Sequence, residues 1–135
     1  MAAYQIDLED TITAVPQLAQ FLSAIAEKEN LSFEVENAMQ LAAEEAVVNI
    51  ITHGYKDTPG MIAVHCLVAD GLVVLTICDE APYFNPLTIP PADIDTGIDE
   101  RRIGGLGVHL IRSLMDEVRY QQTDKGNCLI MQKAI

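Results

Sequence analysis

The chain has 135 residues, a length that most simply forms one domain, residues 1–135, with a hydrophobic core of its own. Half of the residues are hydrophobic, which excludes a disordered tail. The formal net charge is −12, which disfavours non-specific binding to nucleic acid, because this charge would repel the phosphate backbone. No apolar run approaches the ~18 residues that a membrane span needs, and the first residues lack the pattern of a secretion signal, so we expect a soluble cytoplasmic protein.

The first part of the chain predicts one strand followed by two helices. Residues 4–9 alternate polar and apolar side chains, as a half-buried strand does. Thr13 can cap a helix that ends near Asn30. Ser32 can cap a second helix, which we expect to run to Gly54, a residue suited to a helix C-terminus.

The second helix carries two polar side chains inside its apolar face. At ~100° per residue, Glu45 and Asn49 lie one turn apart within the apolar arc, whereas Glu44 falls on the polar side. Burial of a carboxyl and an amide is costly unless a partner hydrogen-bonds them. Glu45 and Asn49 are therefore either satisfied by each other or by neighbouring backbone, or they face a cavity that holds a polar ligand.

A strand hairpin and a long loop follow the two helices. Residues 61–68 and 72–78 are β-rich, and the Asp70-Gly71 pair between them is a strong hairpin signal. Asp79 stands at the end of the second run, where it can contact a ligand or act as the acid of a turn that ends the strand. Four prolines at positions 82, 86, 90 and 91 exclude a regular element, so we expect a long functional loop that extends to residue 100.

The three cysteines predict neither a disulfide framework nor a zinc site. Cys66, Cys78 and Cys128 are odd in number, widely spaced and embedded in apolar runs. We expect small buried thiols in a reducing compartment.

The last part of the chain predicts a helix that follows a glycine cluster, and then a second hairpin. Gly105 and Gly107 suggest an anion site, since free backbone N–H groups and the helix dipole both favour phosphate there, although a flexible hinge is the alternative. A dinucleotide fingerprint needs a preceding strand and a third glycine, and a P-loop needs Gly-Lys-Ser/Thr, so both are excluded. Strands are expected at residues 118–122 and 128–133.

The order of these elements lacks regular alternation of strands and helices. It therefore predicts an α+β fold, a two-layer sandwich in which a mainly antiparallel sheet has the helices on one face.

Together these segments resemble the GHKL ATPase superfamily, and within it the anti-sigma-factor serine/threonine kinases, over nearly the whole chain. The first family motif, Glu-x-x-x-Asn followed by His-Gly-Tyr, is matched by residues 45–49 and 53–55. The second, an aspartate followed by a small residue and a Pro-Phe-Asp-Pro-like tail, is similar to residues 79–86. The third, Gly-Gly-Leu-Gly before a helix, is matched by residues 104–107.

The resemblance implies a role for each motif. Asn49 is implied to coordinate Mg²⁺ between the phosphates of ATP, Glu45 to orient or deprotonate the attacking hydroxyl, and Asp79 to accept a hydrogen bond from the adenine amino group. Residues 81–102 are implied to form a lid over the nucleotide. Phosphoryl transfer needs positioning and charge neutralisation more than covalent help, which suits these groups. The other nucleotide-binding residues implied are Ala81, Arg102, Gly104, Gly105, Leu106, Gly107 and Val108.

The chain departs from the family pattern at several of its positions. Asn127 and Cys128 stand where some relatives have a threonine near the nucleotide. Ile103 stands where some relatives have an arginine near the γ-phosphate, and Arg102 or Arg101 can serve instead.

The resemblance implies an ATP- and Mg²⁺-dependent serine/threonine protein kinase, an anti-sigma regulatory factor that phosphorylates an anti-sigma-factor antagonist. It also implies a sigma factor as second partner and a homodimer. The alternative is an ATP-binding regulatory module that sequesters a protein partner without kinase activity. A third reading, the catalytic half of a histidine kinase, needs a phosphoacceptor-histidine helix pair, and the predicted elements contain none.

Overall fold

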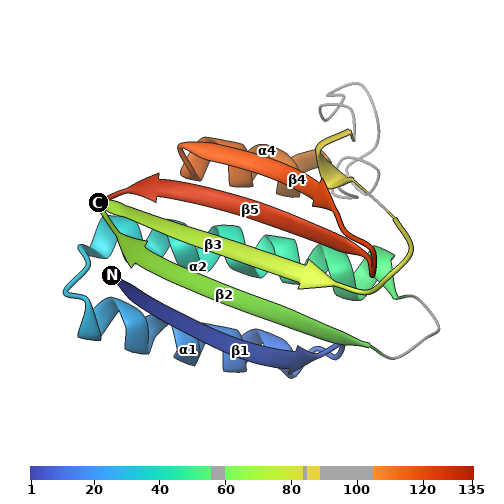
Figure 1. Cartoon of the computed structure of the whole chain (residues 1–135), viewed down its shortest axis with the longest axis horizontal. Helices are drawn as coiled ribbons and strands as arrows, with labels where there is room; N and C mark the ends of the chain where they lie inside the picture. The colour runs from blue at the N-terminus through green and yellow to red at the C-terminus, as the bar shows by residue number, and fades with distance from the viewer. Residues whose placement is uncertain (56–59, 84, 89–104) are drawn as a thin grey trace.

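The computed structural model describes residues 1–55, 60–83, 85–88 and 105–135. Figure 1 shows the course of the chain. Its elements are, in order, β1 (Ala2–Glu9), α1 (Ala14–Lys28), α2 (Phe33–Asn49), the π-helix η1 (Ile50–Gly54), β2 (Met61–Ala69), β3 (Leu72–Asp79), the 3₁₀ turn η2 (Pro86–Thr88), α4 (Gly105–Leu114), β4 (Glu117–Gln122) and β5 (Asn127–Ala134).

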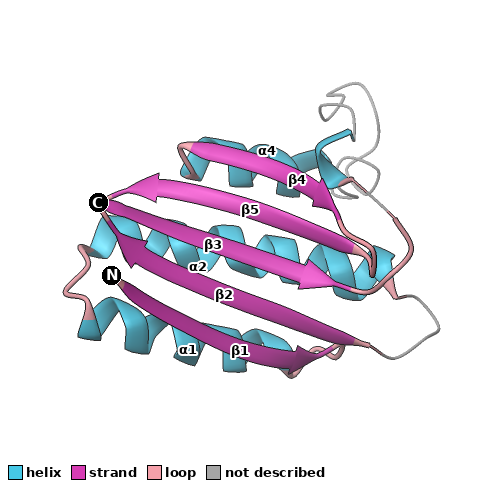
Figure 2. Cartoon of the chain, in the orientation of Figure 1, coloured by secondary structure: helices cyan, strands magenta, loops and turns pink. Residues whose placement is uncertain are grey.

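The strands form one sheet in the order β1-β2-β3-β5-β4, and every neighbouring pair is antiparallel. The helices α1, α2 and α4 lie together on one face of this sheet, with α2 between the other two (Figure 2). The predicted α+β two-layer sandwich is therefore confirmed. Among the described residues, no helix combines the length and the apolar character needed to cross a lipid bilayer.

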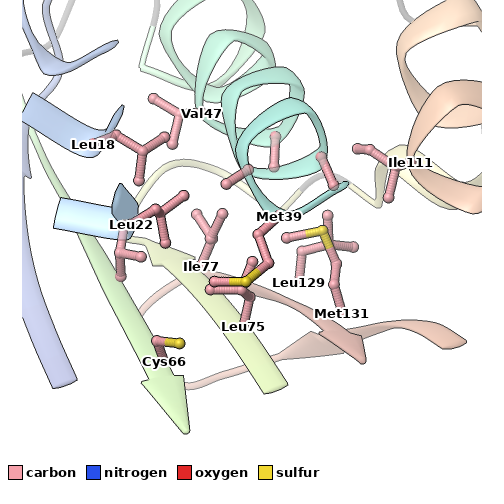
Figure 3. Packing of buried hydrophobic residues seen from close by; sticks show 14 of the residues in the cluster. Leu18, Leu22, Met39, Val47, Cys66, Leu75, Ile77, Ile111, Leu129 and Met131 are labelled. Carbon is pink, nitrogen blue, oxygen red and sulfur yellow. The ribbon is translucent and has the colours of Figure 1, made fainter. Parts of the chain in front are cut away.

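The core lies between the sheet and the three helices. Alternate residues of β2 and β3 are buried, because successive side chains of a strand point to opposite faces. Figure 3 shows Leu22 of α1, Met39 of α2 and Ile111 of α4 directed toward side chains of the central strands. This packing places the C-terminal end of α2 over the C-terminal end of β3 and the N-terminal end of β5, where the candidate site lies.

Local turn and cap chemistry agrees with the sequence at two places and differs at one. Asp70 and Gly71 have φ of 54° and 77°, as a two-residue hairpin turn requires, and the Ser32 hydroxyl accepts a hydrogen bond from the Val35 backbone N–H at 3.2 Å. Thr13 is the N-cap residue of α1, as predicted, but its side chain makes no cap bond. The Thr13 hydroxyl is instead 2.6 Å from that of Thr11.

The prediction of three free thiols was wrong for two of the cysteines. Cys78 of β3 and Cys128 of β5 are direct partners across the two strands, with Cα atoms 4.1 Å apart, and form a disulfide. Cys66 is a buried free thiol. Pairing of cysteines 50 residues apart depends on the β3–β5 register, and wide spacing in the sequence carries no information on it.

Candidate functional site

The C-terminal end of α2 brings Glu45 and Asn49 to one wall of the site. The side predicted for them was correct, since Glu44 is exposed whereas Glu45 and Asn49 are half-buried. Burial raises the pKa of the Glu45 carboxyl, and the negative charge of Glu44 raises it further. A raised pKa makes the Glu45 carboxylate a stronger proton acceptor.

The side-chain amide nitrogen of Asn49 is buried and has no hydrogen-bond partner within the part of the chain that the structure describes. Leaving such a group unsatisfied costs about 1–3 kcal/mol, and such groups in folded proteins call for an explanation. A polar ligand beside Asn49 is the simplest explanation, because the same residue lines the pocket described below.

The helix changes geometry immediately after Asn49. The predicted continuation to Gly54 is confirmed as a helical path, but residues Ile50–Gly54 form a π-helix, a feature that is frequent at functional sites. A β-carbon at Gly54 would lie 3.3 Å from the β-carbon of Ala81. Glycine therefore allows the end of the helix to approach the turn that follows β3.

Asp79 ends β3 and faces the helix layer. It is only 8% exposed, and its Oδ1 accepts hydrogen bonds from the Ala81 backbone N–H and from the Asn127 side-chain amide, both at 2.9 Å. Burial raises the pKa of the Asp79 carboxyl above its ordinary value, and these two hydrogen bonds partly oppose the rise. The site thus holds a carboxylate in a position where ionisation is costly.

Asn127 connects three segments around Asp79. Besides Asp79 Oδ1, its side-chain nitrogen donates to the backbone oxygens of Ala81 at 3.3 Å and Pro82 at 3.2 Å. Its side-chain oxygen accepts a hydrogen bond from the Tyr120 hydroxyl of β4. The family resemblance put Asn127 near the nucleotide, but the sequence revealed neither its partners nor Tyr120, because these contacts are reached only through the strand register.

Tyr55 ties the residues that follow η1 to the same turn. Its hydroxyl donates to the Met61 backbone oxygen at 2.6 Å and accepts from the Glu80 backbone N–H at 2.7 Å. The ring packs against Gly60, where a β-carbon would come within 2.1 Å of it. Tyr55 therefore links the helix end, the start of β2 and the turn after Asp79.

The glycine motif lies at the start of α4. Gly105, Leu106 and Gly107 form the first turn of this helix, and Val108 is buried. Gly104, Arg102 and the alternative Arg101 lie outside the described residues, as do residues 89–100 of the predicted lid. The end of α2, the end of β3 and the start of α4 all lie at one end of the molecule (Figure 1).

The ends of α2 and β3, together with residues of η1, η2, β4 and β5, enclose a pocket, and none of its described lining residues belongs to α4. It includes Asn49 and Asp79 on facing elements, whereas Glu45 is not among the described residues that line it. Apolar side chains supply most of the rest of its wall, as is usual in sites for small molecules. The described lining residues are Ala46, Asn49, Ile50, Gly54, Ile77, Asp79, Pro86, Tyr120, Asn127, Cys128 and Leu129.

The sequence of this chain matches a known protein family. Residues 8–133 match the family described as the histidine kinase-like ATPase domain. The chain belongs to this family. The resemblance that the three sequence motifs carried is thereby confirmed.

Relatives of this histidine kinase-like ATPase domain include named kinases. Serine-protein kinase RsbW of Listeria monocytogenes is 33% identical over 119 residues, which cover 84% of this chain and 75% of that protein. Serine-protein kinase RsbW of Staphylococcus aureus is 32% identical over 120 residues, with the same coverage. These matches extend over most of both chains.

A solved structure has the same fold. The crystal structure of the RsbU and RsbW domains of Rv1364c from Mycobacterium tuberculosis superposes with a TM-score of 0.72 at 19% identity. The superposition spans 99% of this chain and 32% of that longer chain.

Proposed function

We propose that this protein is an ATP- and Mg²⁺-dependent serine/threonine protein kinase that acts as an anti-sigma regulatory factor. Its substrate is an anti-sigma-factor antagonist, its second partner is a sigma factor, and it works as a homodimer. Family membership and the named serine-protein kinases among its relatives support the activity. The partners rest on the resemblance to anti-sigma-factor kinases.

One observation carries the nucleotide part of the proposal. The buried Asn49 amide nitrogen without a described partner and the buried Asp79 carboxyl line the same pocket, Asn49 from the end of α2 and Asp79 from the end of β3. A ligand that satisfies both must carry a hydrogen-bond donor for the Asp79 carboxylate and an acceptor for the Asn49 amide nitrogen. ATP with a divalent cation meets both requirements, since adenine supplies an amino group as donor and the phosphates supply acceptor oxygens.

Each residue has a role in binding. Asp79 accepts a hydrogen bond from the adenine amino group, and Asn127 holds the Asp79 carboxylate in place. The backbone N–H groups of Gly105 and Gly107, in the first turn of α4, face the phosphates together with the positive end of the helix dipole. Asn49 presents its side-chain oxygen to Mg²⁺, which, when bound, neutralises phosphate charge.

Glu45 serves the transfer step. As the serine or threonine oxygen bonds to the γ-phosphorus and the bond to the β–γ bridging oxygen breaks, the hydroxyl proton passes to the Glu45 carboxylate. ADP leaves with the electron pair of the broken bond. The raised pKa of Glu45 favours acceptance of that proton near neutral pH.

The experiment is a transfer assay with a matched control. The protein is incubated with Mg-ATP and the candidate antagonist, and phosphoserine or phosphothreonine is sought by mass spectrometry. Wild type and Glu44→Ala should both transfer phosphate, since Glu44 is exposed on the polar side of α2. Absence of transfer by wild type that still binds both ATP and antagonist would rule out the kinase.

A second candidate function is a nucleotide-responsive binding module that sequesters its partner without phosphorylating it. The absence of Glu45 from the described pocket lining favours it. This function predicts partner affinity that changes with nucleotide, and no difference between wild type and Glu45→Ala in signalling output.

A further inference from the structure

The disulfide between Cys78 and Cys128 lies directly beside the nucleotide contacts. In β3 and β5, the next pair in register is Asp79 and Asn127. We propose that Cys78 and Cys128 form a reversible thiol–disulfide modification site that sets the ATP affinity of the adjoining pocket, an inference that rests on the proposed nucleotide binding.

Strand geometry explains how the disulfide acts on the pocket without filling it. Neighbouring residues of a strand point to opposite faces, so the cysteine side chains lie on the face away from the helices while Asp79 and Asn127 face the helices. Asp79 is 8% and Asn127 6% exposed, whereas both cysteines are half-buried. Cys128 also contributes to the pocket wall. The disulfide therefore ties together the two strand ends that carry the hydrogen-bonded Asp79–Asn127 pair.

A small thiol reagent can reach the site from solvent. Cys78 lines a second, more polar depression on the surface, together with Glu80, Thr123 and Lys125. Cys66, by contrast, is buried in the core, and burial raises the pKa of its thiol to about 12. We therefore expect thiol–disulfide exchange at Cys78 and Cys128 and not at Cys66, which serves as an internal control.

Oxidation and reduction need no rearrangement of the sheet. The β3–β5 register holds every residue from Leu72 to Asp79 opposite a partner in β5, so the two cysteines are neighbours in either state. The ladder bonds are independent of the sulfur atoms. The change is therefore local to the strand ends, where the site lies.

The reaction balances with a low-molecular-weight disulfide such as oxidised glutathione as oxidant. One cysteine thiolate attacks the small disulfide and releases one small thiolate, which gives a mixed disulfide. The other cysteine thiolate then attacks the mixed disulfide, forms the Cys78–Cys128 bond and releases the second small thiolate. The two protons of the protein thiols end on the two released small thiols. An excess of reduced small thiol reverses both steps.

The disulfide state should bind ATP more tightly. A disulfide beside Asp79 and Asn127 holds the Asp79 carboxylate, the hydrogen-bond acceptor for adenine, in place before ATP binds. This lowers the conformational entropy that is lost on binding. A change at one site commonly alters ligand affinity at another by about 5- to 150-fold. We expect a change near 5-fold here, because the backbone hydrogen bonds between β3 and β5 already restrict these strand ends.

The test measures thiol state and ATP affinity on the same samples of the full chain. Wild type is held in reduced or oxidised glutathione, alkylated and weighed by mass spectrometry, and its affinity for ATP with Mg²⁺ is measured by calorimetry. We expect affinity to fall about 5-fold on reduction and to return on reoxidation. Cys66→Ala should behave as wild type, whereas Cys78→Ser and Cys128→Ser should stay at the weaker value under both conditions.

Three outcomes would overturn the inference. Equal affinity in samples whose thiol state differs by mass would refute the coupling while leaving ATP binding intact. Failure of Cys78 and Cys128 to oxidise, measured without any nucleotide, would refute the modification site. Absence of ATP binding in both states would refute the proposed function itself, and the coupling with it.

Discussion

Asn127 donates a hydrogen bond to Asp79 at 2.9 Å across β3 and β5, although the two residues are 48 positions apart in the sequence. Both side chains are buried, and the same Asn127 nitrogen also reaches the backbone oxygens of Ala81 and Pro82. One amide thus fixes a buried carboxylate together with the turn beside it.

Asn127→Ala should destabilise the protein and weaken nucleotide binding together. The substitution removes the hydrogen bonds that Asn127 donates to Asp79 Oδ1 and to the backbone oxygens of Ala81 and Pro82, and a buried group left without its partner costs about 1–3 kcal/mol. Chemical denaturation measures the loss of stability. Gln121→Ala, an exposed change in β4, is the control, and a loss no larger than that of Gln121→Ala would contradict the role of Asn127.

Asp79→Asn should raise the stability of the free protein at neutral pH while weakening ATP binding. The pKa of the Asp79 carboxyl in the folded protein is raised above its ordinary value of 3.8 by burial, so the stability contribution of the neutral form is lost as the pH rises through the folded pKa. The asparagine oxygen still accepts the hydrogen bonds but carries no charge.

Thermal unfolding at several pH values checks this prediction. The melting temperature of Asp79→Asn should exceed that of wild type by a few degrees at pH 7, and the difference should vanish below pH 3.8, where the carboxyl is protonated in both the folded and the unfolded chain. A difference in melting temperature that grows toward low pH would show that the pKa of Asp79 is not raised in the folded protein.

Glu45→Ala should lower phosphoryl transfer by roughly 10²-fold and leave ATP affinity nearly unchanged, because a general base contributes to the chemical step and not to nucleotide binding. Single-turnover transfer to the antagonist and calorimetry separate the two effects. Glu44→Ala, with the same chemical change one residue away on the exposed side, should match wild type in both. Equal loss of ATP affinity in Glu45→Ala and Asn49→Ala would mean that the two roles are assigned wrongly.

Tyr55→Phe should loosen the turn after Asp79. The substitution removes the hydroxyl that bonds Met61 and Glu80, at an expected cost of about 1–3 kcal/mol in the free energy of unfolding. Amide hydrogen exchange should increase at the Glu80 N–H. Tyr83→Phe removes a hydroxyl from a residue that is 59% exposed and should change neither quantity.

The fold and half of the site follow from local sequence patterns. The 3.6-residue period places Glu45 and Asn49, and not Glu44, toward the interior. The end of the second β-rich run places Asp79 at the boundary between a strand and a loop, and Asp79 does end β3. The Asp70-Gly71 turn follows from the positive φ that a tight hairpin needs. These signals are carried by residues close together in the chain.

What the sequence did not reveal depends on contacts between distant residues. The Asp79–Asn127 bond and the Cys78–Cys128 disulfide both require the β3–β5 register, which is set by packing across the whole sheet. The approach of Gly54, at the end of the π-helix, to Ala81 likewise joins segments that are distant in the sequence.

The central claim is that the Asn49–Asp79 pocket binds ATP with Mg²⁺. The most direct measurement is calorimetric titration of wild type and Asn49→Ala with ATP, in the presence of Mg²⁺ and in its absence. We expect Mg²⁺ to strengthen ATP binding by wild type, and Asn49→Ala to lose about tenfold or more of that affinity while remaining folded, since a contact to a charged group is removed. Equal affinity of both proteins with Mg²⁺, or no ATP binding by folded wild type, would contradict the claim.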